Sequence, residues 1–291
     1  QRRRKFFLFF HTYQVHDPYV HPERWVELFD DTGYQGPLRD TMARLRGGTG
    51  AWDERHRVFW EGVERTDPRA VAFVTSLYDA GIRRMDAETL APLLDRLEEF
   101  GLTRDTLVVF TSDHGEAFAE HGAFLHDDLY AGTLRVPLVL RWPARLPAGV
   151  RVPARVRSID VMPTILALLD IPAPPQVQGR SLVPLLTDAS AGGPGDVASE
   201  YSVPGRVYES FRHADRSYIA DGATERVLAA PPADARDVTG EEPATLAAMR
   251  AALARWHGAC RPLAARYGPR AGTVRPGTDA LERLRALGYV Q

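Results

Sequence analysis

The sequence predicts an α/β layer fold, in which a mostly parallel central sheet is flanked by helices, with a small α+β subdomain at its C-terminal end. Three apolar runs indicate central strands, at residues 6–10, 107–111 and 136–142. Each run is continuous rather than alternating, as expected for strands that are covered on both faces. Helical patterns lie between and after these runs, and such an alternation of strands and helices is typical of a layered α/β domain.

Two helices accompany the predicted strands. Over residues 82–100 the apolar side chains keep helical spacing, and Gly101 follows as the residue that ends the helix. Pro92 within this stretch predicts a kink or a restart, because proline lacks the amide hydrogen that a helix interior needs. The second helix has Asp160 as its N-cap and Pro163 in its first turn.

The organisation of the chain is predicted to change near residue 190. We assign residues 1–190 to the α/β layer and residues 196–291 to the small subdomain, because a Gly-, Ala- and Pro-rich stretch separates them. The segment 21–75 has no clean periodicity and is interpreted as a loop-rich insertion. The subdomain is expected to contain short strands around 206–212 and 217–220, a helix over 243–256 and a final helix over 279–287.

Composition excludes several classes of protein. The 291 residues carry a formal charge of -2, so there is no basic field that would bind nucleic acid or an anionic membrane. A single cysteine, Cys260, rules out an internal disulfide and a cysteine-based metal cluster. The apolar run at 6–10 is too short for a signal peptide or a membrane span, so no membrane segment is expected. Oligomeric state is not indicated.

The strongest chemical signal comes directly after the second apolar run. There the strand leads into Thr111-Ser-Asp113-His114-Gly-Glu116. Ligands of open α/β sheets bind at the carboxyl ends of strands, and a carboxylate beside an imidazole offers two donors to one divalent cation. The alternative is a polar turn in which Asp113 only caps the next backbone segment.

Histidines form the second signal. His121 and His126 come after the Asp113-His114 turn, on a loop that could bring either onto an oxyanion, although surface histidines are the alternative. The first apolar run likewise leads into His11 and His16, so two predicted strands end in histidines and acids. If those strands are parallel neighbours, both clusters open into one crevice. Asp17 and His21 are interpreted as turn residues.

Several ordered blocks resemble the bacterial sulfatases of the alkaline-phosphatase superfamily. They are residues 7–19 with the histidines, 78–86 (Tyr-Asp-x-x-Ile), 111–116 (Thr-Ser-Asp-His-Gly-Glu), 129–143 (Leu-Tyr through Arg-Val-Pro to Arg-Trp-Pro), 158–164, 178–182 and 284–289. The resemblance implies an alkaline-phosphatase-like sandwich, present here in part as the C-terminal portion of a sulfatase catalytic domain over residues 1–190. The resemblance does not distinguish a periplasmic from a cytoplasmic location in a bacterium.

The resemblance also implies roles for individual residues. Asp113 and His114 would be two ligands of a divalent cation, calcium in first place, with manganese or magnesium as alternatives because calcium prefers oxygen donors. His16 would bind the sulfate or protonate the leaving alcohol, and His126 would stabilise charge on the sulfate oxygens. His11 would lie on the substrate side.

The sequence departs from the family in one functional respect. The Cys/Ser-x-Pro-Ser/Thr-Arg motif, whose first residue becomes the formylglycine nucleophile, is absent, and Cys260-Arg-Pro-Leu-Ala264 matches it only at its start. Because the chain opens on a predicted strand, we expect a fragment of a longer reading frame. The expected function is hydrolysis of small-molecule or glycan sulfate esters. The alternatives are a phosphodiesterase or phosphonate monoester hydrolase of the same superfamily and a non-catalytic binding or partner protein.

Overall fold

The computed structural model describes residues 5–48, 50–188, 192–193, 195–203, 205–222, 224–229 and 236–267. They form two compact units. The first unit holds the described residues up to Leu102 together with 118–122, and the second holds 103–117 and the described residues from 123 onward. The predicted final helix at 279–287 lies outside the described residues. The predicted boundary near residue 190 stays a prediction.

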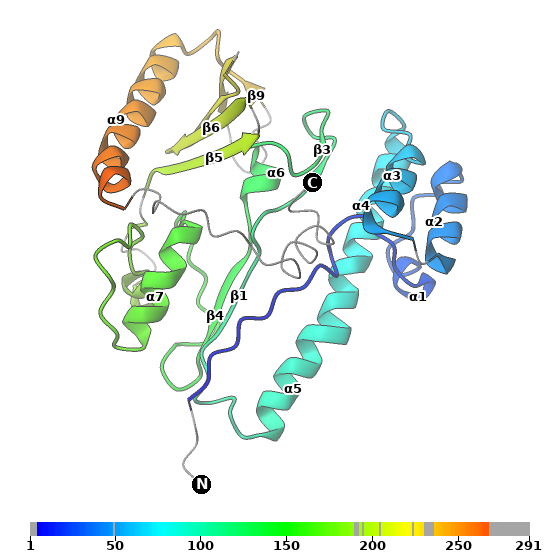
Figure 1. Cartoon of the computed structure of the whole chain (residues 1–291), viewed down its shortest axis with the longest axis horizontal. Coiled ribbons are helices and arrows are strands. Elements are labelled where there is room, and N and C mark those ends of the chain that lie inside the picture. Colours follow the sequence, from blue (N-terminus) through cyan, green and yellow to red (C-terminus); the bar gives the residue numbers. More distant parts are fainter. Residues whose placement is uncertain are drawn as a thin grey trace. The chain divides into compact units, whose positions relative to one another are not determined.

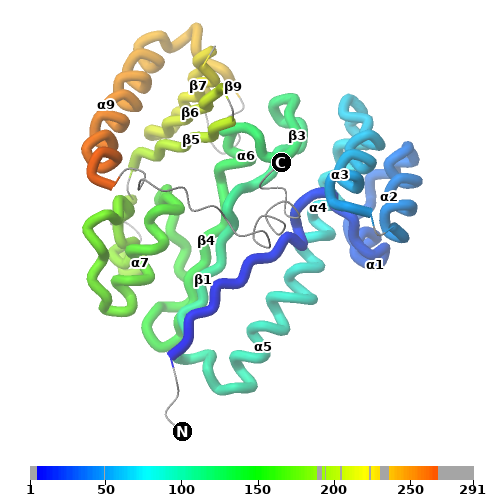
Figure 2. The backbone as a smooth tube through the Cα atoms, in the orientation of Figure 1, coloured from blue at the N-terminus to red at the C-terminus, as the bar shows by residue number. Residues whose placement is uncertain are grey.

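The first unit is helical (Figures 1 and 2). Its elements are α1 (Glu23–Val26), α2 (Pro37–Gly47), α3 (Trp52–Glu61), α4 (Pro68–Met85), the π-helical turn η1 (Asp86–Leu90) and α5 (Ala91–Glu99). The interpretation of 21–75 as a loop-rich insertion was therefore wrong. In α2, Leu38, Met42 and Leu45 recur every three or four residues and are buried, but so short a helix gives only a weak periodic signal.

The start of the long helix α4 lies in the segment interpreted as a loop-rich insertion, although its local signals are typical of a helix start. Asp67 caps it by accepting a hydrogen bond from the Arg69 backbone nitrogen at 2.9 Å, and Pro68 occupies the first turn. Where Pro92 predicts a kink or a restart, the helix does not restart: the π-helical turn η1 connects α4 to α5 as one helical path (Figure 2). The predicted ending is observed, since Gly101 has φ +62°.

The second unit mixes helices and sheets. Its first part contains β1 (Val108–Thr111), the short strand β3 (Phe124–Leu125), α6 (Ala131–Leu134), β4 (Leu138–Arg141), a 3-10 turn η2 (Ser158–Asp160), α7 (Val161–Leu168) and α8 (Val183–Thr187). The short strand β2 (Ala117–Phe118) begins in this unit, and its second residue belongs to the first unit. Its last part contains β5 (Val197–Val203), β6 (Arg206–His213), β7 (Arg216–Ala220), β8 (Glu225–Ala229), β9 (Arg236–Asp237) and α9 (Pro243–Tyr267).

The mostly parallel central sheet is not found among the described residues. β1 pairs with β4, and the pairing is antiparallel, with Val109 opposite Leu140. Residues 6–10 are not a strand, and the Phe7 side chain is 85% exposed. A continuous apolar run predicts coverage on both faces, but it specifies neither the partner of a strand nor its direction. The prediction was wrong on those two points.

The last part of the second unit is a five-stranded antiparallel sheet covered by α9 (Figure 1). Phe211, Tyr218 and Val227 of the sheet pack against Met249 and Leu253 of the helix in one buried cluster. The two strands predicted around 206–212 and 217–220 are thus confirmed as β6 and β7. The predicted helix at 243–256 is confirmed and continues to Tyr267.

Candidate active site

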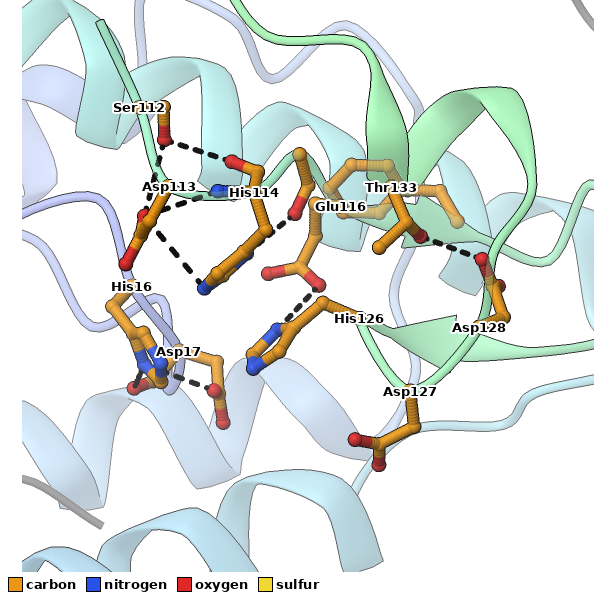
Figure 3. Close-up of polar contacts among 12 residues, drawn as sticks. His16, Asp17, Ser112, Asp113, His114, Glu116, His126, Asp127, Asp128 and Thr133 are labelled. Carbon is orange, nitrogen blue, oxygen red and sulfur yellow. Dashed lines mark hydrogen bonds and ion pairs between the residues drawn. The ribbon is translucent and has the colours of Figure 1, made fainter. Parts of the chain in front are cut away.

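The turn after β1 is held by close backbone packing. The Gly115 backbone nitrogen donates to the Thr133 carbonyl at 2.7 Å, and a Cβ atom at Gly115 would lie 2.1 Å from the Gly132 carbonyl oxygen. Only glycine fits so close an approach. Ser112 adds a hydrogen bond from its Oγ to the His114 carbonyl at 2.7 Å. This packing fixes the backbone that carries Asp113 and His114 (Figure 3).

Asp113 and His114 present neighbouring donor atoms. The Asp113 Oδ1 accepts a hydrogen bond from the His114 backbone nitrogen at 3.1 Å and lies 3.9 Å from His114 Nε2. On the other side of the ring, His114 Nδ1 lies 2.8 Å from the Gly115 carbonyl oxygen. A carbonyl only accepts, so Nδ1 carries the hydrogen and Nε2 is left as the coordinating nitrogen. Two atoms 3.9 Å apart fit one cation bound at about 2.1–2.5 Å from each.

His126 stacks on His114. The ring centroids are 3.9 Å apart and the planes are inclined by 22°. His126 Nδ1 lies 3.2 Å from Oε1 of Glu116, whose side chain is only 4% exposed (Figure 3). An ionised carboxylate only accepts hydrogen bonds, so the hydrogen of neutral His126 is on Nδ1 and Nε2 is left as the acceptor. The structure thus brings together three of the predicted residues, Asp113, His114 and His126.

Glu116 was not among the residues predicted to have a role. Its signal was present, because Glu116 ends the Thr111-Ser-Asp-His-Gly-Glu block and is the first acid after His114. No spacing rule links it to His126, ten residues further on. Their contact depends on the loop geometry between them, which the sequence alone does not specify.

The other two predicted residues, His11 and His16, lie in the first unit. His11 packs on Tyr13, with ring centroids 4.9 Å apart. His16 Nδ1 lies 2.9 Å from the Asp17 carbonyl oxygen and 3.1 Å from Asp17 Oδ1. Their predicted part in substrate binding stays a prediction. His121, one of the two alternatives on the loop after His114, is exposed.

Asp17 lies on a bend, as its interpretation as a turn residue implies, but its carboxylate is buried. It accepts a hydrogen bond from Trp60 Nε1 at 3.1 Å and is in contact with the Nδ1 atoms of His16 and His56. Burial raises the pKa of the Asp17 carboxyl, but the hydrogen bonds from these three donors outweigh it and hold that pKa well below its usual value. His56 is 39 residues away in the chain, so no local pattern could have indicated this contact.

Among the described residues, no helix combines the length and the apolar character that crossing a membrane requires.

Known proteins are similar to this chain in sequence and in fold. Arylsulfatase K of Mus musculus is 38% identical over 110 residues, which are 37% of this chain and 20% of that protein. The N-acetylglucosamine-6-O-sulfatase of Bacteroides thetaiotaomicron is 31% identical over 141 residues, or 46% of this chain and 25% of that protein. The chain therefore aligns with a quarter or less of the length of these relatives.

Solved structures with a similar fold span more of the chain. The phosphonate monoester hydrolase of Silicibacter pomeroyi superposes with a TM-score of 0.61 at 23% identity, covering 78% of this chain and 48% of that one. The structure of BT4656 in complex with its substrate D-glucosamine-2-N,6-O-disulfate gives a TM-score of 0.58 at 21% identity, covering 86% of this chain and 59% of that one. The Sulfatase family profile matches residues 1–171, which is more than half of the chain. The chain belongs to the sulfatase family.

Proposed function

We propose that the protein containing this chain hydrolyses sulfate esters in a metal-dependent reaction, with Asp113 and His114 as ligands of a divalent cation and His126 as a group that binds the sulfate. The observation that carries the proposal is the stacked pair of His114 and His126 beside Asp113. Both imidazoles have Nδ1 against an acceptor, so both present Nε2 to a ligand. Sulfatase family membership supports the reaction type.

The donor set indicates which cations to test. When bound, the cation would supply positive charge to the reacting oxygens. Asp113 offers a hard oxygen, which suits calcium, magnesium and manganese, whereas His114 offers a nitrogen that calcium seldom takes. We propose calcium as the first candidate and manganese or magnesium as alternatives. Asp113 and His114 hold their donor atoms in place through the Gly115 turn, whichever cation binds.

His126 and His16 take separate parts in the proposal. His126, with Glu116 behind it, would hold a positive charge against the sulfate oxygens. His16 would donate its proton to the leaving alcohol, and His11 would contact the substrate, as the family resemblance implies. The relatives named as glucosamine and aryl sulfatases support a sulfated sugar or aryl sulfate as substrate. The nucleophile is proposed to be the formylglycine of the family, from a segment outside this chain.

The test compares two ester classes. The purified full-length protein would be assayed on an aryl sulfate and on an aryl phosphate diester, after chelation and after return of calcium, manganese or magnesium. We expect faster sulfate turnover that is lost on chelation and in Asp113→Ala, with Asp215→Ala, an exposed aspartate, as the control. Dominant turnover of the phosphate diester would replace the proposal with a phosphodiesterase. Absence of hydrolysis on both would support a non-catalytic binding protein.

A further inference from the structure

A small pocket lies beside His16 in the first unit. Its volume is about 220 Å³, and its walls include Tyr13, Trp52 and Arg55. Pockets for drug-sized ligands have roughly 300–1,000 Å³, so a pocket of this size suits a single sugar or aryl ring. Because His16 also lines the pocket and is proposed to face the ester oxygen, a ring bound there would belong to the alcohol part of the substrate.

The Trp52 ring is a fixed wall of this pocket. Its Nε1 donates a hydrogen bond to the Asp17 carbonyl oxygen at 3.2 Å, and the His56 ring stacks on it with centroids 4.8 Å apart. The ring centroid of His16 lies 6.2 Å from that of Trp52. Aromatic walls with polar groups near them suit a sugar ring, which has apolar C–H faces and polar substituents.

Arg55 supplies positive charge to the pocket. Its Nη1 donates to the carbonyl oxygens of Leu45 at 2.9 Å and Gly48 at 2.8 Å, at the end of α2. These two bonds hold the partly buried guanidinium in place but use only one of its nitrogens. Arg55 makes no ion pair with a residue that the structure describes, and its Nε and Nη2 donate to none of them. The planar arrangement of guanidinium donors is suited to binding an anionic group through two hydrogen bonds.

Asp17 also lines the pocket, but other donors already occupy its carboxylate. Its side chain is 2% exposed, with Oδ1 at 3.1 Å from His16 Nδ1, and its Oδ2 accepts a hydrogen bond from Trp60 Nε1 at 3.1 Å. Asp53 and Glu54, the neighbouring acids of α3, do not line the pocket. A ligand in the pocket therefore meets unused donors of Arg55 and a carboxylate that is already hydrogen-bonded.

We propose that this pocket binds the sugar ring of a substrate that carries a second anionic group besides the ester sulfate, with Trp52 packing against the ring and Arg55 binding that group. The second group is a carboxylate or another sulfate. This inference rests on the proposed sulfate ester hydrolysis, because His16 connects the pocket to the ester. A sugar without the second group would leave the partly buried donors of Arg55 without a partner, so the pocket should discriminate against it.

The kinetic test compares sugar sulfates that differ in one anionic group. One pair is D-glucosamine-2-N,6-O-disulfate and N-acetylglucosamine-6-O-sulfate, and the other is a sulfated glucuronic acid and glucose sulfated at the same position. For the full-length protein, Arg55→Gln should raise KM about tenfold for the member with the second anionic group, with little change in kcat, because the contact is made equally before and during the reaction. The pair that responds identifies sulfate or carboxylate as the group that Arg55 binds.

Two further variants complete this test. Trp52→Leu should raise KM for both members of a pair, because both contain the sugar ring. Arg57→Gln is the matched control, since Arg57 belongs to the same helix but is exposed and paired with Glu61 at 2.8 Å, and it should leave every KM unchanged. If Arg55→Gln affects both members of each pair equally, or if the wild type does not prefer the second anionic group in either pair, the proposal is overturned.

A binding measurement separates this inference from the function on which it rests. The NMR signal of the Trp52 indole N–H, assigned with Trp52→Phe, is followed while glucuronic acid, glucosamine-2-N-sulfate or glucose is added to the full-length protein. We expect a saturable shift with an anionic sugar, no shift with glucose, and loss of the shift in Arg55→Gln but not in Arg57→Gln.

The outcomes of this titration are decisive whether or not hydrolysis is observed. Absence of a shift with both anionic sugars would overturn the proposal, and so would an equal shift with glucose. If Arg55→Gln does not fold, the decision rests on this comparison of sugars in the wild type. A saturable shift in a protein that hydrolyses no sulfate ester would refute the proposed function and leave the pocket as a site for anionic sugars.

Discussion

At the scale of single residues, His21 is a buried imidazole that the fold keeps neutral. It is 3% exposed, and neither ring nitrogen has a hydrogen-bond partner among the described residues. Gly81 makes room for it, since a Cβ atom there would lie 2.7 Å from His21 Nε2. Burial, together with the positive charges of Arg84 and Arg46, lowers the pKa of His21 from 6.5 to about 4.

This shift predicts a loss of stability in weak acid. Below pH 6.5 the unfolded chain binds a proton at His21 that the folded chain does not bind until about pH 4, so the free energy of unfolding falls through that window. The loss should approach about 3 kcal/mol at about pH 4. Urea unfolding at about pH 7 and about pH 4.5 should show a smaller loss for His21→Leu than for the wild type. The exposed His213→Leu serves as control, and equal losses in all three proteins would refute the prediction.

Glu116 is predicted to affect catalysis indirectly, through its contact with His126. Glu116→Gln removes the negative charge behind His126 Nδ1 and keeps the size of the side chain. We expect kcat on a sulfate ester to fall by about 10- to 100-fold in the full-length protein, as for other groups that orient a functional imidazole. Steady-state kinetics would measure it, with the exposed Glu120→Gln as control. A kcat equal to that of the wild type would show that His126 does not depend on Glu116.

At the scale of elements, the five-stranded sheet braces the loop that carries His126. Three contacts reach consecutive parts of this loop: Tyr201 Oη donates to Asp127 Oδ1 at 2.8 Å, Arg226 Nη1 donates to Tyr130 Oη at 2.8 Å, and Arg212 Nη2 donates to the Leu129 carbonyl at 3.4 Å. Burial and the neighbouring Asp127 raise the pKa of Tyr201 to about 12, so its hydroxyl keeps its proton and remains a donor. The sheet thus has a structural role in the proposed active site.

Removing one of these contacts should loosen the loop. Tyr201→Phe loses a hydrogen bond to a charged but exposed group, worth about 1 kcal/mol. Hydrogen exchange of residues 124–134 should therefore become about fivefold faster, while exchange in α9 stays the same. Tyr208→Phe is the matched control, because Tyr208 lies beside Tyr201 with ring centroids 5.7 Å apart. Unchanged exchange in the loop would mean that the other two contacts suffice to hold it.

Local patterns predicted several elements, but they missed the helices within residues 21–75, assigned a strand to residues 6–10 that is not there, and did not give the strand pairings. The end of α5 just before Gly101 and the strands β6 and β7 follow from spacing and from the conformational preferences of glycine. The antiparallel pairing of β1 with β4 depends on contacts between distant parts of the chain, which an apolar run does not encode. The site divides in the same way. Asp113 and His114 are adjacent and were found together, whereas the link between Asp17 and His56 is created by folding.

At the scale of the whole molecule, residues 6–10 form an exposed apolar stretch. The exposed fractions of its five side chains run from 56% for Phe6 to 85% for Phe7, and the described residues give it no strand partner. Contiguous exposed apolar surface with unpaired backbone favours association between chains. A formal charge of only -2 on 291 residues opposes that association weakly.

We therefore expect this chain to self-associate in solution through residues 6–10. Phe7→Glu combined with Phe9→Glu places two negative charges within the stretch, so association should weaken because each contact between chains would bury unpaired charge. Light scattering after size-exclusion chromatography, over a wide range of concentration, should show a mass that rises for the wild type and stays monomeric for the double variant. The control for the added charge is Leu28→Glu, because Leu28 is exposed but lies outside the stretch 6–10. This variant should associate as the wild type does. A wild-type chain that remains monomeric at every concentration would show that this stretch does not mediate association.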